Sequence, residues 1–261
     1  MSIVDTIETL DFLRSAEASP DGARVALVSS RVADNVDSFT LSILDSTDGA
    51  VLFERQGSAP FSRPSWSPDG RALATTEAVG DRRQILLVED GDGGWTARSL
   101  DAHAHGVRAG EMGWSPDGGQ LAFLYPVNGP RDPSAPIRVT RRFWRQEGQG
   151  LVDDNLSGIG IVTRDGTVSY LDIPQDRVLS QPTFSPDGRL LAFKSALDPA
   201  NEAAGPAPGL SIFDLTSGTM RVVVEPGLGW MARFAFVDDQ RIASCARASH
   251  QARAATPTSS T

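Results

Sequence analysis

Apolar residues occur along this chain in short runs, and residues typical of turns bound each run. The clearest runs follow four copies of Ser-Pro-Asp-Gly, which begin at Ser19, Ser67, Ser115 and Ser185. An apolar residue and an alanine come shortly afterwards in every copy, as in Leu191-Ala192-Phe193. Such runs predict buried strands, in which the small residue lies where a neighbour comes close. The pattern therefore predicts an all-β fold.

Ser-Pro-Asp-Gly itself predicts a tight hairpin turn. Proline fixes φ near the value of the first corner, and aspartate tolerates the second corner and can accept hydrogen bonds from its own backbone. Glycine follows where a positive φ is needed. An aromatic residue precedes the serine in three copies, as Trp66, Trp114 and Phe184. We expect these rings to pack between repeats rather than to bind a cofactor.

The period of the repeat indicates the architecture. Pro20, Pro68 and Pro116 follow one another at intervals of 48 residues. Each unit continues with a second hairpin, whose turn is rich in aspartate and glycine, as in residues 84–100. Four antiparallel strands per unit at this spacing are typical of a β-propeller blade.

The repeats predict an incomplete β-propeller over residues 18-242, with about four and a half blades where about seven are usual. The third blade contains an insertion at 126-157, because Pro186 follows Pro116 by 70 residues. A degraded fifth copy of the motif occurs at residues 236–243. The predicted blades are 18-57, 58-102, 103-175, 176-227 and the start of a fifth at 228-242.

The two ends of the chain have other patterns. Apolar residues at helical spacing and a capping box at Ser2 predict a short helix over Ser2–Arg14, within an N-terminal segment 1-17 that leads into blade one. Residues 243-261 contain no Val, Ile, Leu, Met, Phe, Trp, Tyr or Gly and no acidic residue. We therefore predict that this tail is disordered and is not native propeller sequence.

Composition narrows the choice of partners. The net charge of −9 argues against a nucleic-acid surface. No run of 18 apolar residues occurs, and the N-terminus lacks the pattern of a signal peptide, so we expect a cytoplasmic protein with no membrane partner. Cys245 is the single cysteine, which excludes an intrachain disulfide, and no nearby base marks it as a nucleophile. We expect no cofactor.

One polar cluster is a candidate metal site. Asp101, His103 and His105 form the pattern Asp-x-His-x-His before the third blade, and His-x-His on a strand places both rings on one side. No convincing further ligand is nearby. We favour a solvated loop and expect no metal.

A basic patch in this acidic chain consists of Arg138, Arg141, Arg142 and Arg145. Arginine binds carboxylates through paired hydrogen bonds, so the patch could meet a peptide carboxylate or a second domain. The other interpretation is a solvated strand whose Val139 and Phe143 pack inward.

The tandem aromatic-Ser-Pro-Asp-Gly repeats resemble the propeller of the prolyl oligopeptidase clan (the S9 serine peptidases) and the TolB propeller with its PD40 repeats. Segment Arg141–Leu151 is similar to the Arg-x-x-Tyr-x-x-x-Gly-x-Gly stretch of the acylaminoacyl-peptidase branch, with Trp144 where tyrosine is usual. The helix before the first repeat and the Pro-rich stretch after the third favour the same branch. The resemblance covers roughly residues 1 to 242.

In that family the propeller caps a C-terminal α/β-hydrolase domain and filters peptides by size, and the hydrolase domain carries Gly-x-Ser-x-Gly followed by Asp and His. This chain contains no Gly-x-Ser-x-Gly, so no catalytic residue is carried over. The resemblance implies a non-catalytic propeller that gates peptide access to a hydrolase domain absent from these 261 residues. The alternative is a stand-alone propeller that binds a protein or peptide, although an unclosed propeller would leave strand edges open.

Overall fold

The computed structural model describes residues 11–33, 36–110, 112–129, 134, 136, 145–146, 150–151, 156–197, 208–226 and 229–248. The regular structure of these residues consists of β-strands, which confirms the predicted all-β fold. The described segments include no helix long and apolar enough to cross a membrane.

Within the described residues, four antiparallel sheets of four strands follow one another along the chain, and we call them blades 1 to 4. Blade 1 contains β1 (Asp11–Ala18), β2 (Arg24–Ala33), β3 (Val36–Asp45) and β4 (Val51–Gly57). Blade 2 contains β5 (Ser65–Trp66), β6 (Ala72–Val79), β7 (Arg82–Gly91) and β8 (Gly94–Leu100). Blade 3 contains β9 (Gly113–Trp114), β10 (Gln120–Pro126), β13 (Ser157–Thr163) and β14 (Val168–Tyr170). Blade 4 contains β15 (Arg177–Phe184), β16 (Leu190–Leu197), β17 (Gly209–Asp214) and β18 (Thr219–Val224).

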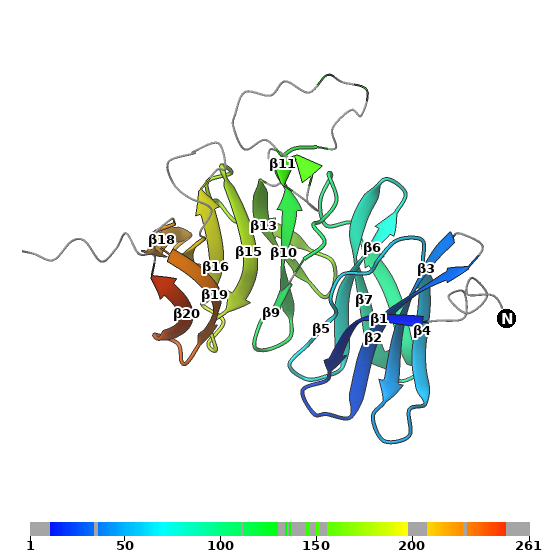
Figure 1. The fold of residues 1–261 in the computed structure, drawn as a ribbon. Helices are drawn as coiled ribbons and strands as arrows, with labels where there is room; N and C mark the ends of the chain where they lie inside the picture. Colours follow the sequence, from blue (N-terminus) through cyan, green and yellow to red (C-terminus); the bar gives the residue numbers. More distant parts are fainter. Residues whose placement is uncertain are drawn as a thin grey trace, which may run out of the picture.

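Two smaller sheets complete the described structure. Strands β19 (Gly229–Phe236) and β20 (Ile242–Ala248) pair with each other and form blade 5. Strands β11 (Arg145–Gln146) and β12 (Gly150–Leu151) pair within the long connection between β10 and β13. Figure 1 shows the blades side by side in an arc, from β1–β4 at one end to β19 and β20 at the other. The first strands of blades 1 to 4 contact one another in succession, so they meet at the axis of the arc.

The Ser-Pro-Asp-Gly segments form the predicted turns. In blade 4 the Gly188 N–H donates to the Ser185 carbonyl at 2.9 Å, and Ser185 Oγ accepts from the Leu190 N–H at 2.9 Å. The same hydroxyl donates to Asp187 Oδ1 at 2.6 Å. Gly188 has a φ of 73°, the left-handed region that glycine adopts without strain. The same hydrogen bonds recur in the turns of Ser19, Ser67 and Ser115.

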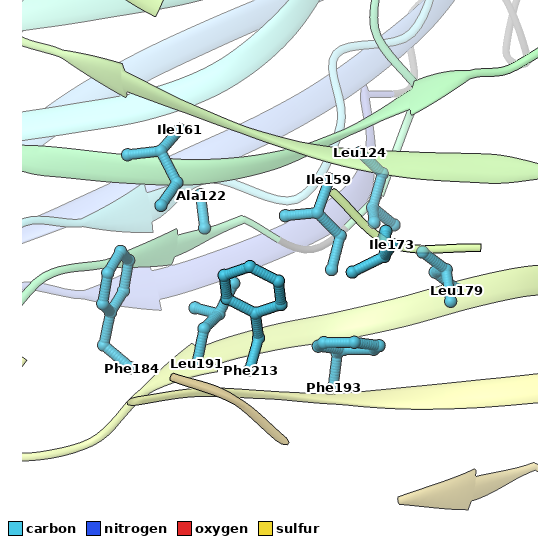
Figure 2. Close-up of a cluster of buried hydrophobic side chains, with 10 residues drawn as sticks. All are labelled: Ala122, Leu124, Ile159, Ile161, Ile173, Leu179, Phe184, Leu191, Phe193 and Phe213. Atoms are coloured by element: carbon cyan, nitrogen blue, oxygen red, sulfur yellow. The ribbon is translucent and has the colours of Figure 1, made fainter. Parts of the chain in front are cut away.

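Each of blades 2 to 4 packs on its predecessor through a row of four side chains, one from each strand. The row of blade 4 is Phe184, Leu191, Phe213 and Met220. Figure 2 shows its phenylalanines directed at the side chains of β10 and β13 in blade 3. The corresponding rows are Trp66, Leu73, Val88 and Ala97 in blade 2, and Trp114, Leu121, Val162 and Val168 in blade 3. The predicted interblade position of the aromatic rings is therefore confirmed, and burial of each large side chain contributes about 1.5–3 kcal/mol.

The helix predicted over Ser2–Arg14 is wrong for its described part. Residues 1–10 lie outside the described residues, and Asp11–Ala18 is strand β1. Strand β1 pairs with β2 from Asp11 to Ala18, and this ladder satisfies its backbone groups along one edge. A short isolated helix is marginal in water, so pairing with a neighbouring strand outweighs its local helical pattern.

The prediction of a disordered tail at 243-261 is also wrong for its first residues. Residues 243–248 belong to strand β20, which pairs with β19 throughout, whereas 249–261 lie outside the described residues. Strand pairing uses backbone groups and needs no large side chain on β20. Its partner β19 supplies the buried side chain, Phe234, and Phe236 packs against the same cluster.

Candidate functional site

A cavity of about 370 Å³ opens where the first strands of blades 1 to 4 converge, and we call it the axial cavity. Its wall is formed by the ends of β1, β5, β9 and β15 and the segments just before β5 and β9. Each blade contributes here because its first strand ends at the Ser-Pro-Asp-Gly turn at the same level of the arc.

An ion pair stands at the wall of the axial cavity between blades 1 and 2. Arg63 donates from Nε to Glu17 Oε1. The side chain of Arg63 is 51% exposed and that of Glu17 is 26% exposed, so solvent screens the pair and its contribution to stability is small. The cavity therefore presents one cation and one anion beside each other.

The tryptophan rings fix the carbonyl groups of the wall. Trp66 Nε1 donates to the Glu17 carbonyl of blade 1 at 2.9 Å, and Trp114 Nε1 donates to the Ser65 carbonyl of blade 2 at 3.0 Å. Each indole thus reaches the backbone of the preceding blade. Phe184 occupies the same position in blade 4 and has no such donor.

Gln181 gives the wall of the cavity an unusual backbone at blade 4. Among the described residues, Gln181 is the non-glycine residue with a positive φ, and its value is 55°. The pairing of β15 with β16 is interrupted by a bulge between Ser180 and Thr183. The Gln181 amide donates from Nε2 to the Phe234 carbonyl of blade 5 at 3.3 Å. Backbone strain of this kind costs about 1–3 kcal/mol and concentrates at functional sites.

The approach of blade 3 to blade 4 at this level leaves no room for a side chain. A Cβ atom placed on Gly113 would lie 2.3 Å from the Pro182 carbonyl oxygen. Glycine at this position therefore allows β9 and β15 to meet beside the cavity.

The chemistry of the axial cavity suits binding. Its described lining contains the hydroxyls of Ser65 and Thr183, the Gln181 amide and the Glu17–Arg63 pair. That lining includes no histidine, the general base that most often activates a serine or threonine hydroxyl. The sequence analysis did not identify these residues, because none of them belongs to a recognisable motif. The one sequence feature that could have indicated them is their position shortly before a Ser-Pro-Asp-Gly turn.

Most of the basic patch predicted from the sequence lies outside the described residues. Arg138, Arg141 and Arg142 lie outside the described residues. Arg145 begins β11 and pairs through its backbone with Leu151. The patch belongs to the connection between β10 and β13, whereas the axial cavity is formed by other segments.

The Asp-x-His-x-His segment forms a turn against blade 3. The His103 ring stacks on Tyr125 with centroids 4.2 Å apart, and its Nδ1 accepts from the His105 N–H at 3.1 Å. Burial lowers the pKa of His103, and the neighbouring His105 lowers it further, whereas Asp101 acts in the opposite direction. Within the described residues no three His, Cys, Asp or Glu side chains are grouped to hold a metal ion.

Four-stranded antiparallel sheets that meet at an axial cavity define the architecture as that of a β-propeller. No protein-family model matches the chain. The uncharacterized peptidase YuxL of Bacillus subtilis (strain 168) is 28% identical over 216 residues, which are 77% of this chain and 32% of that protein. The chain thus spans about a third of the length of this relative.

Solved structures agree on the fold. The acylaminoacyl peptidase of Pyrococcus horikoshii matches with a TM-score of 0.61 and 14% identity, over 90% of this chain and 37% of that one. An oligogalacturonate lyase in complex with manganese matches with a TM-score of 0.52 and 18% identity, over 81% of this chain and 52% of that one. The predicted resemblance to the propeller of acylaminoacyl peptidases is confirmed, and at these identities it shows the fold.

Proposed function

We propose that this chain is the non-catalytic propeller portion of an acylaminoacyl-peptidase-like serine peptidase. In this proposal its blades are part of a ring of about seven, and the ring controls the access of peptides to an α/β-hydrolase domain. The observation that carries the proposal is the match to a peptidase over 77% of this chain but only 32% of that protein. The propeller of an acylaminoacyl peptidase has the same fold, which supports it.

The axial cavity is the place where a peptide would meet the propeller. Strands β5 and β9 are edge strands of their sheets and line the cavity, and an extended peptide can add its own backbone to such an edge. The Glu17–Arg63 pair supplies charges for the termini of a peptide. Arg138, Arg141, Arg142 and Arg145 would belong to an entrance or interdomain surface.

The alternative function is a stand-alone scaffold that binds a protein or peptide. The likeness to an oligogalacturonate lyase shows that this fold occurs with other activities, so the fold alone does not choose between the two. Both proposals use the axial cavity. They differ in whether binding depends on the size of the partner.

The test is a binding measurement with the purified chain. A fluorescent N-acetylated peptide should raise its anisotropy on binding, and the same peptide displayed in a loop of a folded protein should fail to compete. Arg63→Ala in the cavity should weaken binding, whereas Arg221→Ala on the exposed outer strand β18 should not. Absence of peptide binding, or equal weakening by the two substitutions, would refute a role for the cavity. Equal competition by the folded protein would favour the scaffold.

A further inference from the structure

A further cavity, of about 400 Å³, lies between blades 3 and 4 near their outer strands, and we call it the rim pocket. Its inner wall is apolar and includes Ile161 of β13 and Phe213 of β17, which are buried. Figure 2 shows these two side chains on opposite sides of the interface between the blades. Both blades are four-stranded sheets packed on each other, so further blades beyond blade 5 would not come between them. A volume of this size is typical of small-molecule sites, which range over about 300–1,000 Å³.

A small residue on the outer strand of blade 3 opens one side of the rim pocket. Ser169 of β14 pairs with Ile161 and lines the pocket. At the same position the outer strands of the other four-stranded blades carry a large side chain, namely Phe53, Arg98 and Arg221. Serine therefore leaves unfilled the space that a large side chain covers elsewhere.

A glycine of blade 4 opens the other side. Gly218 lies in the turn between β17 and β18, two positions before Met220 of the interblade row. In blade 2 the residue two positions before the row member Ala97 is Trp95, whose ring packs on the core between blades 1 and 2. The φ of Gly218 is 68°, so the turn itself favours glycine here. The tryptophan of one interface is thus replaced by a glycine in the other.

The chain fills the equivalent space between blades 1 and 2 with an aromatic ring and a cation. The guanidinium carbon of Arg24 lies 5.2 Å from the centroid of the Trp95 ring. Arg24 also donates from Nη2 to Asp90 Oδ2 at 3.0 Å. A ring, a cation stacked on it and a carboxylate beside the cation therefore form a stable arrangement at this place in the fold.

The rim pocket lacks the cation as well as the ring. Arg24 is the fifth residue after the serine of its turn, and the fifth residue after Ser115 is Gln120, which lines the pocket. The charged residue of the described lining is Asp172, an exposed carboxylate. The pocket thus offers an apolar wall and a negative charge, which together suit a ligand that is aromatic and positively charged.

We propose that the rim pocket binds a small molecule that joins an aromatic ring to a cationic amine. The ring packs between Ile161 and Phe213, and the amine donates to the Asp172 carboxylate. The side-chain oxygens of Gln120 and Ser169 are further acceptors at the rim. The rim pocket shares no lining residue with the axial cavity, so this site is independent of the proposed role in peptide access.

Tryptamine is a suitable probe, because it joins an indole ring to an ethylammonium group, and indole-3-acetate is its matched anion. Ligand-detected NMR titration of the purified chain at neutral pH should show that tryptamine binds about fivefold more tightly, as one partly exposed ion pair would give. Asp172→Asn should remove this preference, whereas Asp92→Asn in the exposed turn between β7 and β8 should keep it. Absence of tryptamine binding, or an unchanged preference in Asp172→Asn, would overturn the proposal.

Ser169→Phe tests the location of the site. Phenylalanine would restore the large side chain that Phe53 supplies in blade 1, so it should fill the pocket and abolish tryptamine binding. Thr96→Phe adds the same side chain at an exposed position of β8 outside the lining and should leave binding unchanged. Urea midpoints of the two variants check their fold. Full affinity in a folded Ser169→Phe would place the probe elsewhere and refute the proposal; if this variant does not fold, Asp172→Asn decides alone.

Discussion

Trp114 Nε1 lies 3.0 Å from the Ser65 carbonyl oxygen, to which it donates, although the two residues are 49 positions apart in the sequence. The same bond joins Trp66 to Glu17, also 49 positions apart, at 2.9 Å. In blades 2 and 3, the tryptophan at the end of the first strand therefore donates a hydrogen bond to the first strand of the preceding blade. The repeat in the sequence becomes a repeated hydrogen bond in space.

Trp114→Phe tests the value of this bond. The ring would remain between blades 2 and 3, but the Ser65 carbonyl would lose its donor. We expect a loss of stability of about 0.5–1.5 kcal/mol from the hydrogen bond, plus a smaller term for the reduced ring. Trp114→Ala should cost about 3–5 kcal/mol, because it also removes the packing. Urea unfolding midpoints measure both, and an unchanged midpoint for Trp114→Phe would show that the hydrogen bond contributes nothing.

Gly188→Val tests the turn of blade 4. The φ of 73° is unfavourable for a β-branched residue, so we expect a loss of about 1–3 kcal/mol. Gly110→Val is the matched control, because a Cβ atom at Gly110 meets nothing within 4 Å and its φ lies outside the left-handed region. Urea denaturation should shift for the first variant alone. An unchanged midpoint for Gly188→Val would contradict the observed turn.

The aspartates of the Ser-Pro-Asp-Gly turns should make the free energy of unfolding fall at acid pH. The serine hydroxyl, followed by a backbone N–H, lowers the pKa of Asp21, Asp117 and Asp187 below the ordinary value of 3.8. Their ionised form is therefore favoured in the folded state. Their contribution is fully present above pH 3.8 and is lost as the pH falls through the lowered values.

Unfolding midpoints measured between neutral and acid pH should show this loss. Asp117→Asn should reduce the dependence of the unfolding midpoint on acid pH. If the unfolding midpoint of Asp117→Asn fell with pH as steeply as that of the wild type, the hydrogen bond between Ser115 and Asp117 would not be a cause of the loss of stability in acid.

The chain of 261 residues should have no peptidase or esterase activity by itself. It contains no Gly-x-Ser-x-Gly, and the described lining of the axial cavity lacks a histidine base. An acyl-amino-acid anilide is a suitable substrate for the assay. Turnover that persists through repurification and that a serine-directed phosphonate abolishes would contradict this prediction.

The sequence alone determined the repeating parts of this protein. Ser-Pro-Asp-Gly dictates its own turn, because proline, aspartate and glycine each favour one of its backbone conformations. The spacing of Pro20, Pro68 and Pro116 determined that four-stranded units follow one another. The aromatic residue before the serine in three copies marked the packing between blades, because an apolar position that recurs from unit to unit must be covered by a neighbouring unit. Local chemistry and periodicity suffice for such features.

Only the tertiary structure decided the rest. The sequence pattern of residues 2–14 predicts a helix, but residues 11–18 form strand β1 because their backbone pairs with β2. Residues 243–248 likewise belong to strand β20 because their backbone pairs with β19. Glu17, Arg63 and Gln181 come together in the axial cavity although they are far apart in the sequence. No local pattern encodes such a meeting, because it depends on the angle at which one blade packs on the next. Backbone pairing and convergence on an axis are properties of the assembled arc, and the positions of single residues follow from it.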